Sequence, residues 1–272
     1  MNPNTDSPNR ASANDDSPSR DFPNRSSRVA LITGAGGGIG YAAALQFARK
    51  GYRLALCDID AGSAEAAAEA VRAEQGEAAV FVADIGDSTQ VQALMAGIRA
   101  RYGRLDAAFN NAGQNALRTP LAEVDEEDWD RVMRTNVTGS FLCMKHEIRW
   151  MLEQGGGAIV NNCSIFGLGG SISAAYTTSK HALAGMTRSA ALSYASRGVR
   201  INAVCPGLID AGMGARFMER SPHQIDAALA LHPAGRAGTA EEVAQAAVWL
   251  CSDEARYIHG HLLAVDGGYG AR

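Results

Sequence analysis

The 272-residue chain lacks the features of a membrane-embedded or exported protein. No apolar segment is long enough to cross a membrane, and no signal-peptide core is present, so we expect a cytoplasmic protein with no membrane partner. The net charge is only −4, and no basic stripe runs along the sequence. The chain therefore has no electrostatic basis for binding nucleic acid.

Cysteine is scarce as well. Five cysteines, odd in number and widely spaced, do not fit a disulfide framework or a zinc site, so we interpret them as buried thiols in a reducing compartment. They are Cys57, Cys143, Cys163, Cys205 and Cys251. His259 and His261 could share one face of a strand, but no cysteine or acidic cluster near them completes a metal site. We therefore expect no bound metal.

Aliphatic side chains are almost missing from the first 27 residues, which are rich in Asn, Ser, Pro, Asp and Arg. Such a segment cannot offset the entropy cost of ordering by burying apolar surface. We expect residues 1–27 to form a disordered tail and residues 28–272 to form a single domain with a substantial core.

Within that domain, short apolar runs alternate with helical patterns. The apolar runs lie near residues 29–33, 53–57, 79–83, 105–109, 158–163, 199–204 and 261–265. The helical patterns lie near residues 40–50, 62–75, 88–102, 126–153, 175–196 and 240–251. This alternation predicts an α/β fold: a Rossmann-like, doubly wound parallel sheet of about seven strands with helices on both faces. Ligands of such sheets bind at the carboxyl ends of the strands.

A glycine-rich turn follows the first apolar run. The segment Thr33-Gly34-Ala35-Gly36-Gly37-Gly38-Ile39-Gly40 stands between the predicted strand and a helical stretch from Tyr41 to Lys50. Glycines let the backbone turn sharply and approach a ligand, and the free N–H groups and dipole at the start of a helix attract phosphate. The segment is typical of a dinucleotide site.

Asp58 ends the second predicted strand, at about the distance from the glycines where an acidic residue binds an adenosine ribose. The same carboxylate would repel the additional phosphate of NADP, by at most ~4 kcal/mol for unit charges ~4 Å apart at an effective dielectric of ~20. No arginine or lysine lies in the glycine turn or just after Asp58 to reverse this effect. We expect NAD as the cofactor.

Tyr176 and Lys180 stand four residues apart in an alanine-rich helical segment and therefore share one helix face. A phenol with its ordinary pKa of ~10 is a poor base at neutral pH, and holding it ionised near pH 7 requires roughly 4 kcal/mol of stabilisation. A nearby ammonium can supply part of it. The pair is a candidate acid–base centre.

The whole set of motifs resembles the short-chain dehydrogenase/reductase family in its compact, single-domain, NAD-dependent branch. The resemblance covers about Arg28 to Tyr269 and is carried by the glycine turn, Asn110-Asn111-Ala112-Gly113, Asn136, Ser164, Tyr176, Lys180 and Pro206-Gly207. Glycines 34, 37 and 40 also fit the longer branch that modifies sugar nucleotides, but this chain lacks the C-terminal length of that branch.

The resemblance implies a role for each matching residue. The catalytic residues it implies are Asn136, Ser164, Tyr176 and Lys180. The cofactor-binding residues it implies are Gly34, Gly38, Ile39, Gly40, Asp58, Asp84, Ile85, Asn111, Tyr176, Lys180 and Ile209. In this scheme Asp84 meets the adenine amine, Asn111 lies near a cofactor ribose, and Asn136 holds a water that links Lys180 to solvent. An amide inside a helix is disfavoured by propensity, which independently suggests a local kink or a bound water at Asn136.

Two departures from the family pattern concern the substrate side. Ala211 stands where relatives often have a threonine that contacts the nicotinamide carboxamide, and the loop between Ser164 and Tyr176 is one residue shorter than in many of them. Residues 208–237 match the position of a mobile substrate lid.

The substrate class is less sharply indicated than the reaction. Apolar lid residues such as Met213 and Phe217, and a resemblance to enzymes that oxidise cyclic alcohols and ring diols, favour hydride transfer between NAD and a cyclic or apolar secondary alcohol or its ketone. Reduction of 3-oxoacyl thioesters is the enzymatic alternative, and a cofactor-sensing regulator on the same fold is the non-enzymatic one. The resemblance also implies a homotetramer.

Overall fold

The computed structural model describes residues 28–116, 118–220 and 222–272. The predicted tail at residues 1–27 lies outside the described residues. No helix in the described ranges is long and apolar enough to span a membrane.

Seven parallel strands form one sheet in the order β3-β2-β1-β4-β5-β6-β7. The strands are β1 (Val29–Thr33), β2 (Arg53–Asp58), β3 (Ala78–Val82), β4 (Ala107–Asn110), β5 (Gly157–Asn162), β6 (Val199–Pro206) and β7 (Leu262–Val265). The central strand β1 is buried along its whole length, which explains why its sequence is continuously apolar up to Thr33. The predicted fold class is confirmed.

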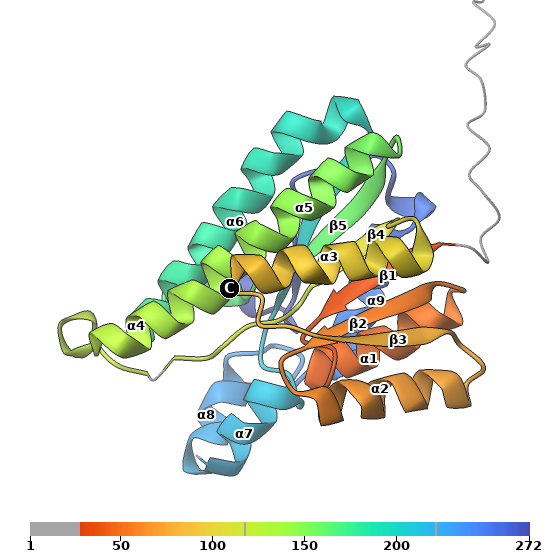
Figure 1. Ribbon diagram of the computed structural model, residues 1–272. Coiled ribbons are helices and arrows are strands. Elements are labelled where there is room, and N and C mark those ends of the chain that lie inside the picture. Colours follow the sequence, from red (N-terminus) through yellow and green to blue (C-terminus); the bar gives the residue numbers. More distant parts are fainter. Residues whose placement is uncertain (1–27, 117, 221) are drawn as a thin grey trace, which may run out of the picture.

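Helices cover both faces of the sheet (Figure 1). They are α1 (Gly38–Arg49), α2 (Ala61–Ala73), α3 (Ser88–Tyr102), α4 (Glu126–Met133), α5 (Ser140–Glu153), α6 (Ala174–Tyr194), α7 (Gly212–Arg220), α8 (Ile225–Ala230) and α9 (Ala240–Cys251). Side chains of α1, α2 and α9 pack on one face and those of α3, α5 and α6 on the other.

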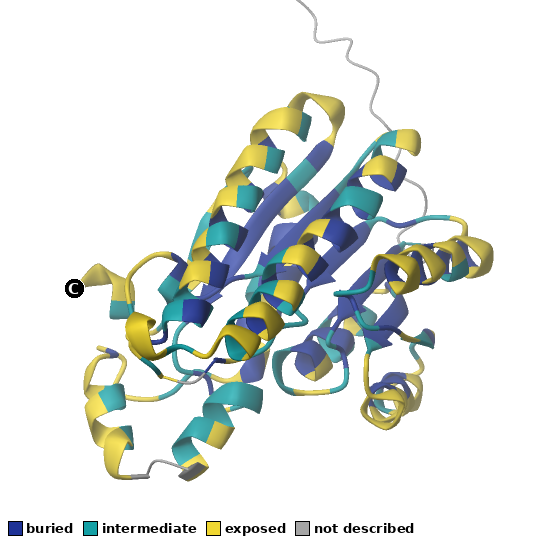
Figure 2. Ribbon diagram, turned by 60° about the vertical axis from the view of Figure 1, so that its left-hand side comes forward, coloured by how far each residue is buried: buried dark blue, intermediate teal, exposed yellow. Residues whose placement is uncertain are grey.

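The strands carry alternate side chains into these two cores. Ala30 and Ile32 of β1 belong to the core beneath α1 and α9, and Val29 and Leu31 belong to the core beneath α3 and α5. Figure 2 shows the central strands buried and the outer sides of the helices exposed, whereas the edge strands β3 and β7 are mainly of intermediate exposure. All five cysteines are buried and free.

The strand order places a crevice at the centre of the sheet. After β3, at one edge, the chain crosses back to β4 on the other side of β1, so the connections that leave β1 and β4 diverge. Ligands of open parallel sheets bind at such a reversal, outside the carboxyl ends of the strands. The glycine turn after β1 and the Asn110-Asn111 pair at the end of β4 meet there.

The predicted helix over residues 126–153 is divided in the structure. Between α4 and α5, the segment Arg134–Gly139 forms a π-helical turn that contains Asn136, a residue only 1% exposed. The Ser140 hydroxyl donates to the Asn136 carbonyl at 2.8 Å. π turns are rare and occur often at functional sites. The local distortion suggested by the amide at Asn136 is this turn.

Two short helices, α7 and α8, lie outside the helical layers (Figure 1). The segment that carries them is closed at its base by a bridge between Ile209 and Gly238. There the Asp210 amide donates to the Gly238 carbonyl at 2.8 Å, and the Gly238 amide donates to the Leu208 carbonyl at 2.9 Å. The segment from 208 to 237 thus begins and ends at one point beside β6.

Candidate active site

The start of α1 is left open by the glycine turn. Its N-cap, Gly37, has no side chain to cap the helix, and the first turn carries no acidic residue. Side chains do cap α2, α3, α4 and α9, through Asp60, Asp87, Asp125 and Thr239. The first N–H groups of α1, together with the positive end of its dipole, are therefore available to an anionic group.

Close packing explains the glycines of this turn. Gly34 has φ +63°, and a Cβ there would lie 2.8 Å from the Ala112 Cα. A Cβ at Gly40 would overlap the carbonyl oxygen of Gly34. A Cβ at Gly38, where φ is +53°, would lie 3.3 Å from the Gly212 backbone at the start of α7. A side chain at Gly34 or Gly40 would force these backbones apart.

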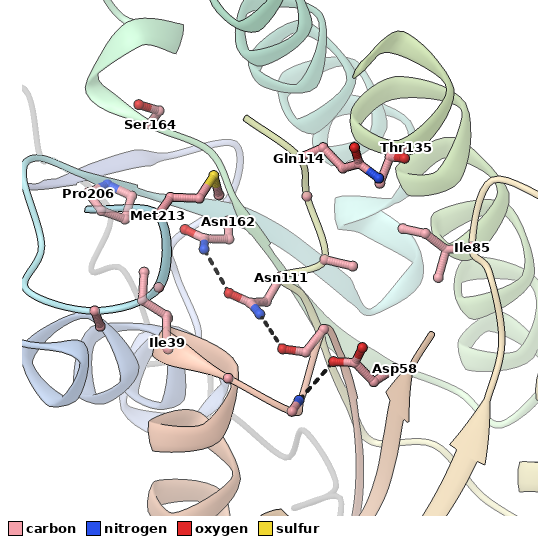
Figure 3. A pocket seen from close by; sticks show the side chains of 18 of the residues that line it. Ile39, Asp58, Ile85, Asn111, Gln114, Thr135, Asn162, Ser164, Pro206 and Met213 are labelled. Atoms are coloured by element: carbon pink, nitrogen blue, oxygen red, sulfur yellow. Dashed lines mark hydrogen bonds between the residues drawn. The ribbon is translucent and has the colours of Figure 1, made fainter. Parts of the chain in front are cut away.

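A cavity of about 630 Å³ extends from the glycine turn along the carboxyl ends of the strands. Asp58, the last residue of β2, lies in its wall, as Figure 3 shows. One carboxylate oxygen accepts from the Gly36 amide at 2.8 Å and the other from the Asp60 amide at 3.1 Å. These bonds fix the carboxylate at the edge of the glycine turn.

Asp84 and Ile85 form the neighbouring wall, after β3. The Asp84 carboxylate accepts from the Gly86 amide at 2.8 Å and forms an ion pair with Arg134 at 2.7 Å. Ile85 is 5% exposed and packs against Gly139, where a Cβ would lie 2.8 Å from the Ile85 Cδ1. The π turn therefore holds this wall in place, because Arg134 pairs with Asp84 and Gly139 packs against Ile85.

A chain of hydrogen bonds links the predicted lysine to the glycine turn. Lys180, which is 3% exposed, donates from Nζ to the Asn162 carbonyl at 2.8 Å. The Asn162 side chain donates to Asn111 Oδ1 at 2.8 Å, and Asn111 Nδ2 donates to the Gly34 carbonyl at 2.9 Å (Figure 3). The carboxyl ends of β1, β4 and β5 are thereby held in one arrangement.

Asn136 holds the loop after β4 from two sides. Its Oδ1 accepts from the Gln114 amide at 2.7 Å, and its Nδ2 donates to the Gln114 carbonyl at 2.9 Å. The same Nδ2 donates to Ser179 Oγ at 3.0 Å, and Ser179 in turn donates to the Tyr176 carbonyl at 2.7 Å. The π turn thus positions both the loop and the helix that carries Tyr176 and Lys180.

Ser164 and Tyr176 lie where the first cavity meets a second one of about 540 Å³. Ser164 Oγ accepts from the Phe166 amide at 3.1 Å, so its own O–H remains free to donate. The ammonium of Lys180 lies 5.4 Å from the centre of the Tyr176 ring. The two side chains therefore lie close together, as their spacing on α6 predicts.

The second cavity has mainly apolar walls. They come from the loop after β4, the loop after Ser164, α7 and α8, and the C-terminal segment. The apolar residues among them include Ile165, Phe166, Ile172, Leu208, Met213, Phe217, Leu231 and Tyr269. Met213 lines both cavities, and Ala211, which carries no hydroxyl, lines the first.

A buried polar cluster lies beneath the site, between α5 and the sheet. Glu147 is fully buried, and its Oε2 accepts from Asn110 Nδ2 at 2.9 Å. Asn110 Nδ2 also donates to Asn161 Oδ1 at 3.1 Å, and Asn161 Nδ2 donates to Thr187 Oγ1 at 2.9 Å. Burial raises the pKa of Glu147 to about 8, against a smaller opposing effect of the Asn110 hydrogen bond.

The structure brings the residues of the predicted site together. Those that line the first cavity are Gly34, Gly38, Ile39, Asp58, Asp84, Ile85, Asn111, Ser164, Tyr176 and Ile209. Gly40, Asn136 and Lys180 do not line this cavity but lie next to residues that do. Gly113, a lining residue, is adjacent to two of them: a Cβ there would lie 3.3 Å from Asn136 Oδ1 and 3.7 Å from Lys180 Nζ.

Sequence reasoning missed Asn162, Gln114 and Ser179, the polar links between these parts. A signal for Asn162 was present, because two asparagines end the apolar strand β5. Gln114 and Ser179 form their hydrogen bonds with a residue distant in the sequence, and no local sequence pattern predicts such bonds.

Comparison with known proteins gives extensive matches. A family model described as enoyl-(acyl carrier protein) reductase matches residues 34–270. The 2,5-dichloro-2,5-cyclohexadiene-1,4-diol dehydrogenase of Sphingobium indicum is 42% identical over 248 residues, which cover 90% of this chain and 98% of the relative. The cis-4-hydroxycyclohexanecarboxylate dehydrogenase of Sinomonas cyclohexanicum is 42% identical over 247 residues, 90% of this chain and 97% of the relative.

Solved structures match to a similar extent. Levodione reductase superposes with a TM-score of 0.86 at 35% identity, covering 90% of this chain and 98% of that one. An NAD⁺-bound xylitol dehydrogenase gives 0.85 at 32% identity, covering 89% and 98%. ElxO with NADP bound gives 0.85 at 32% identity, covering 90% and 100%. Structures similar to this chain thus hold either nicotinamide cofactor.

Proposed function

Because the chain belongs to the short-chain dehydrogenase/reductase family, we propose that it interconverts a cyclic secondary alcohol and its ketone, with NAD as the hydride carrier. Family membership makes it an oxidoreductase that acts on CH–OH groups and binds a nicotinamide cofactor. One observation in particular supports the proposal that the substrate is a cyclic secondary alcohol or its ketone. Ser164 and Tyr176 stand at the junction of a dinucleotide-sized cavity and a mainly apolar cavity.

The residues of the first cavity fit a dinucleotide. The uncapped start of α1 suits a pyrophosphate, and close packing at Gly34 and Gly40 excludes side chains from these two positions of the turn. A nicotinamide cofactor bound there would supply the hydride acceptor for oxidation at the carbinol carbon, and its reduced form would supply the hydride for reduction of the ketone. Asp58, Asn111 and Lys180 would hold the two riboses.

Tyr176 is the proposed acid–base residue. In oxidation its phenol oxygen takes the hydroxyl proton of the alcohol, and in reduction it returns that proton to the carbonyl oxygen. Ser164 donates its free O–H to the same substrate oxygen and so holds it toward Tyr176. Lys180, buried and anchored on the Asn162 carbonyl, stabilises the phenolate. Proton transfer of this kind contributes ~10²–10⁴-fold to the rate.

NAD is proposed over NADP because of Asp58. Its carboxylate is fixed in the cavity wall by two backbone amides, where a ribose hydroxyl can donate to it and a 2′-phosphate would be repelled. Ile59, the next residue, is 68% exposed and supplies no positive charge to compensate. Reduction of 3-oxoacyl thioesters, the alternative, usually uses NADPH, and Asp58 opposes it.

The proposal of a ring-alcohol substrate rests on the apolar second cavity and on the activities of two relatives that are 42% identical. We also propose that residues 208–237 act as the lid of this cavity, because their ends are held at one bridge and α7 and α8 form part of its wall. We also propose a homotetramer, which rests on family resemblance, and a cytoplasmic location, which rests on the five free, buried cysteines and on the absence of a signal-peptide core from the sequence.

The test is a substrate panel assayed by NADH or NADPH absorbance at 340 nm. Cyclohexanol, cyclohexanediols and acyclic secondary alcohols are offered with NAD and with NADP, and acetoacetyl-CoA is offered with both reduced cofactors. The proposal expects turnover of ring alcohols with NAD. Turnover of the thioester with NADPH, and of no alcohol, would replace it with the reductase alternative.

A further inference from the structure

Arg118 is the one formally charged side chain among the described residues that line the second cavity, and no carboxylate accompanies it there. We infer that the substrate carries an anionic group, a carboxylate or its equivalent, on the part of the molecule remote from the reacting hydroxyl, and that Arg118 binds this group. The inference rests on the proposed function, because it concerns the same cavity.

The position of Arg118 places it away from the reacting atoms. The two cavities share Ser164, Tyr176, Gly207, Leu208, Met213 and Gly214, which mark the end where hydride transfer takes place. Arg118 lines only the second cavity, as does Phe217 of α7. The guanidinium lies 5.9 Å from the centre of the Phe217 ring, so it joins the loop after β4 to the proposed lid.

The charge of Arg118 is not neutralised by the protein. Two of the three arginines that line the first cavity form ion pairs, Arg131 with Asp128 and Arg134 with Asp84. The third, Arg216, forms no ion pair within the described residues and does not line the second cavity. Arg118 lies against the Phe217 ring, and no acidic side chain in the described part of the chain forms an ion pair with it. Its donors remain available to a carboxylate, which a guanidinium can bind through two parallel hydrogen bonds.

The other polar groups of the cavity do not offer a second positive charge. His232 is 6% exposed; its Nε2 accepts from the Leu208 amide at 3.1 Å, and its Nδ1 lies 2.9 Å from the Ala228 carbonyl. These contacts fit the neutral imidazole that carries its proton on Nδ1. Asn115 and Gln224 are uncharged. An anion that enters this cavity is therefore attracted to Arg118 specifically.

The expected size of the effect follows from the exposure of Arg118. Exposed ion pairs are weakened by water and by salt, so we expect about a tenfold preference, not a thousandfold one. The same reasoning makes the preference dependent on ionic strength.

The experiment compares two ring alcohols of nearly equal shape, 4-hydroxycyclohexanecarboxylate and 4-hydroxycyclohexanecarboxamide, with NAD and wild-type enzyme. We expect kcat/KM to be about tenfold higher for the carboxylate, mainly through KM, and the ratio to shrink as NaCl is raised. Arg118→Gln should bring the ratio close to one, and Arg118→Lys should retain part of it. Arg197→Gln is the matched control, because Arg197 is also exposed and also lies against an aromatic ring, 5.7 Å from that of Tyr194, but lines neither cavity.

The outcomes separate this inference from the proposed function. If cyclohexanol is oxidised but the carboxylate is not favoured over the amide, the anionic substrate class is wrong and the dehydrogenase activity stands. A preference that survives in Arg118→Gln would overturn the role of Arg118. If no ring alcohol is oxidised with either cofactor, the proposed function itself fails. Should Arg118→Gln not fold, the wild-type ratio and its salt dependence, together with Arg118→Lys, still decide the question.

Discussion

Glu147 and Asn110 form a hydrogen bond of 2.9 Å in the interior, between α5 and the end of β4. Asn110 immediately precedes Asn111, which binds the glycine turn. The carboxyl group has no charged partner in this cluster, and burial raises its pKa to about 8. Glu147 is therefore protonated at neutral pH and acts there as an uncharged polar group.

Stability should consequently fall as the pH rises through this range. In the unfolded chain Glu147 ionises near its ordinary pKa of ~4.3, whereas in the folded protein it keeps its proton until about pH 8, so between these values the folded state binds more protons. The free energy of unfolding should decline by at most ~1.4 kcal/mol per pH unit from this group. Glu147→Gln should remove that decline and be at least as stable as wild type at pH 8. Urea unfolding at pH 6, 7 and 8 measures the free energy of unfolding of wild type and of Glu147→Gln. If this free energy changed with pH in the same way in the two proteins, Glu147 would not be protonated as described.

Tyr176→Phe tests the acid–base role. We expect kcat to fall by at least ~10²-fold, because the substitution removes the oxygen that carries the proton. NADH affinity, measured by fluorescence titration, should change little. Lys180→Ala should lower both turnover and cofactor affinity. Tyr194→Phe, on the same helix and outside both cavities, is the control. A Tyr176→Phe enzyme that kept more than a tenth of wild-type kcat would rule out the mechanism.

Asp58 should determine the choice of cofactor. Wild type should favour NAD over NADP by at least ~10²-fold in kcat/KM, which corresponds to about 2.7 kcal/mol. Asp58→Asn keeps the shape of the side chain and removes its charge. It should therefore lower the ratio of kcat/KM with NAD to kcat/KM with NADP, because the 2′-phosphate of NADP is no longer repelled. Combining Asp58→Ala with Ile59→Arg should favour NADP, since position 59 is exposed and can present a guanidinium to the 2′-phosphate. Equal wild-type efficiency with both cofactors would show that the carboxylate does not face the ribose.

Two glycines of the same turn should respond differently to alanine. At Gly40 an added Cβ would overlap the Gly34 carbonyl, so Gly40→Ala should cost roughly 1–3 kcal/mol of stability. Gly37 has an extended backbone, φ −160°, and a Cβ there would meet nothing within 4 Å. Gly37→Ala should therefore leave the melting temperature of the cofactor-free protein nearly unchanged. Calorimetry on both variants decides, and equal destabilisation would contradict the packing described for the turn.

The strands and the sheet were predictable because a buried parallel strand is continuously apolar, as β1 illustrates. The ends of the strands followed from the same pattern, and with them Asp58, Asn111 and Ser164 as residues of one edge. Tyr176 and Lys180 followed from helical spacing. These inferences depend on local order and on the general rule that places ligands at strand ends.

Other parts of the site depend on contacts between distant segments. The hydrogen bond between Asn162 and Asn111 joins two strands, and that between Asn136 and Gln114 joins a helix to a loop. The π turn was indicated only by an unfavourable amide, and its extent could not be derived, because a π turn and a continuous helix have nearly the same composition. No local pattern predicts that Arg118 lines a cavity, because the segments that form the walls of this cavity are far apart in the sequence.

The π turn at Arg134–Gly139 also holds one more residue than a regular α turn would hold in its place. A π turn closes its hydrogen bonds between residues five apart, whereas an α turn closes them between residues four apart. Removing one residue from the turn would therefore convert it to a regular α turn and leave α5 in its orientation against the sheet. The change would instead displace Asn136 from its place between Gln114 and Ser179. The extra residue therefore serves the site, and the packing of α5 does not require it.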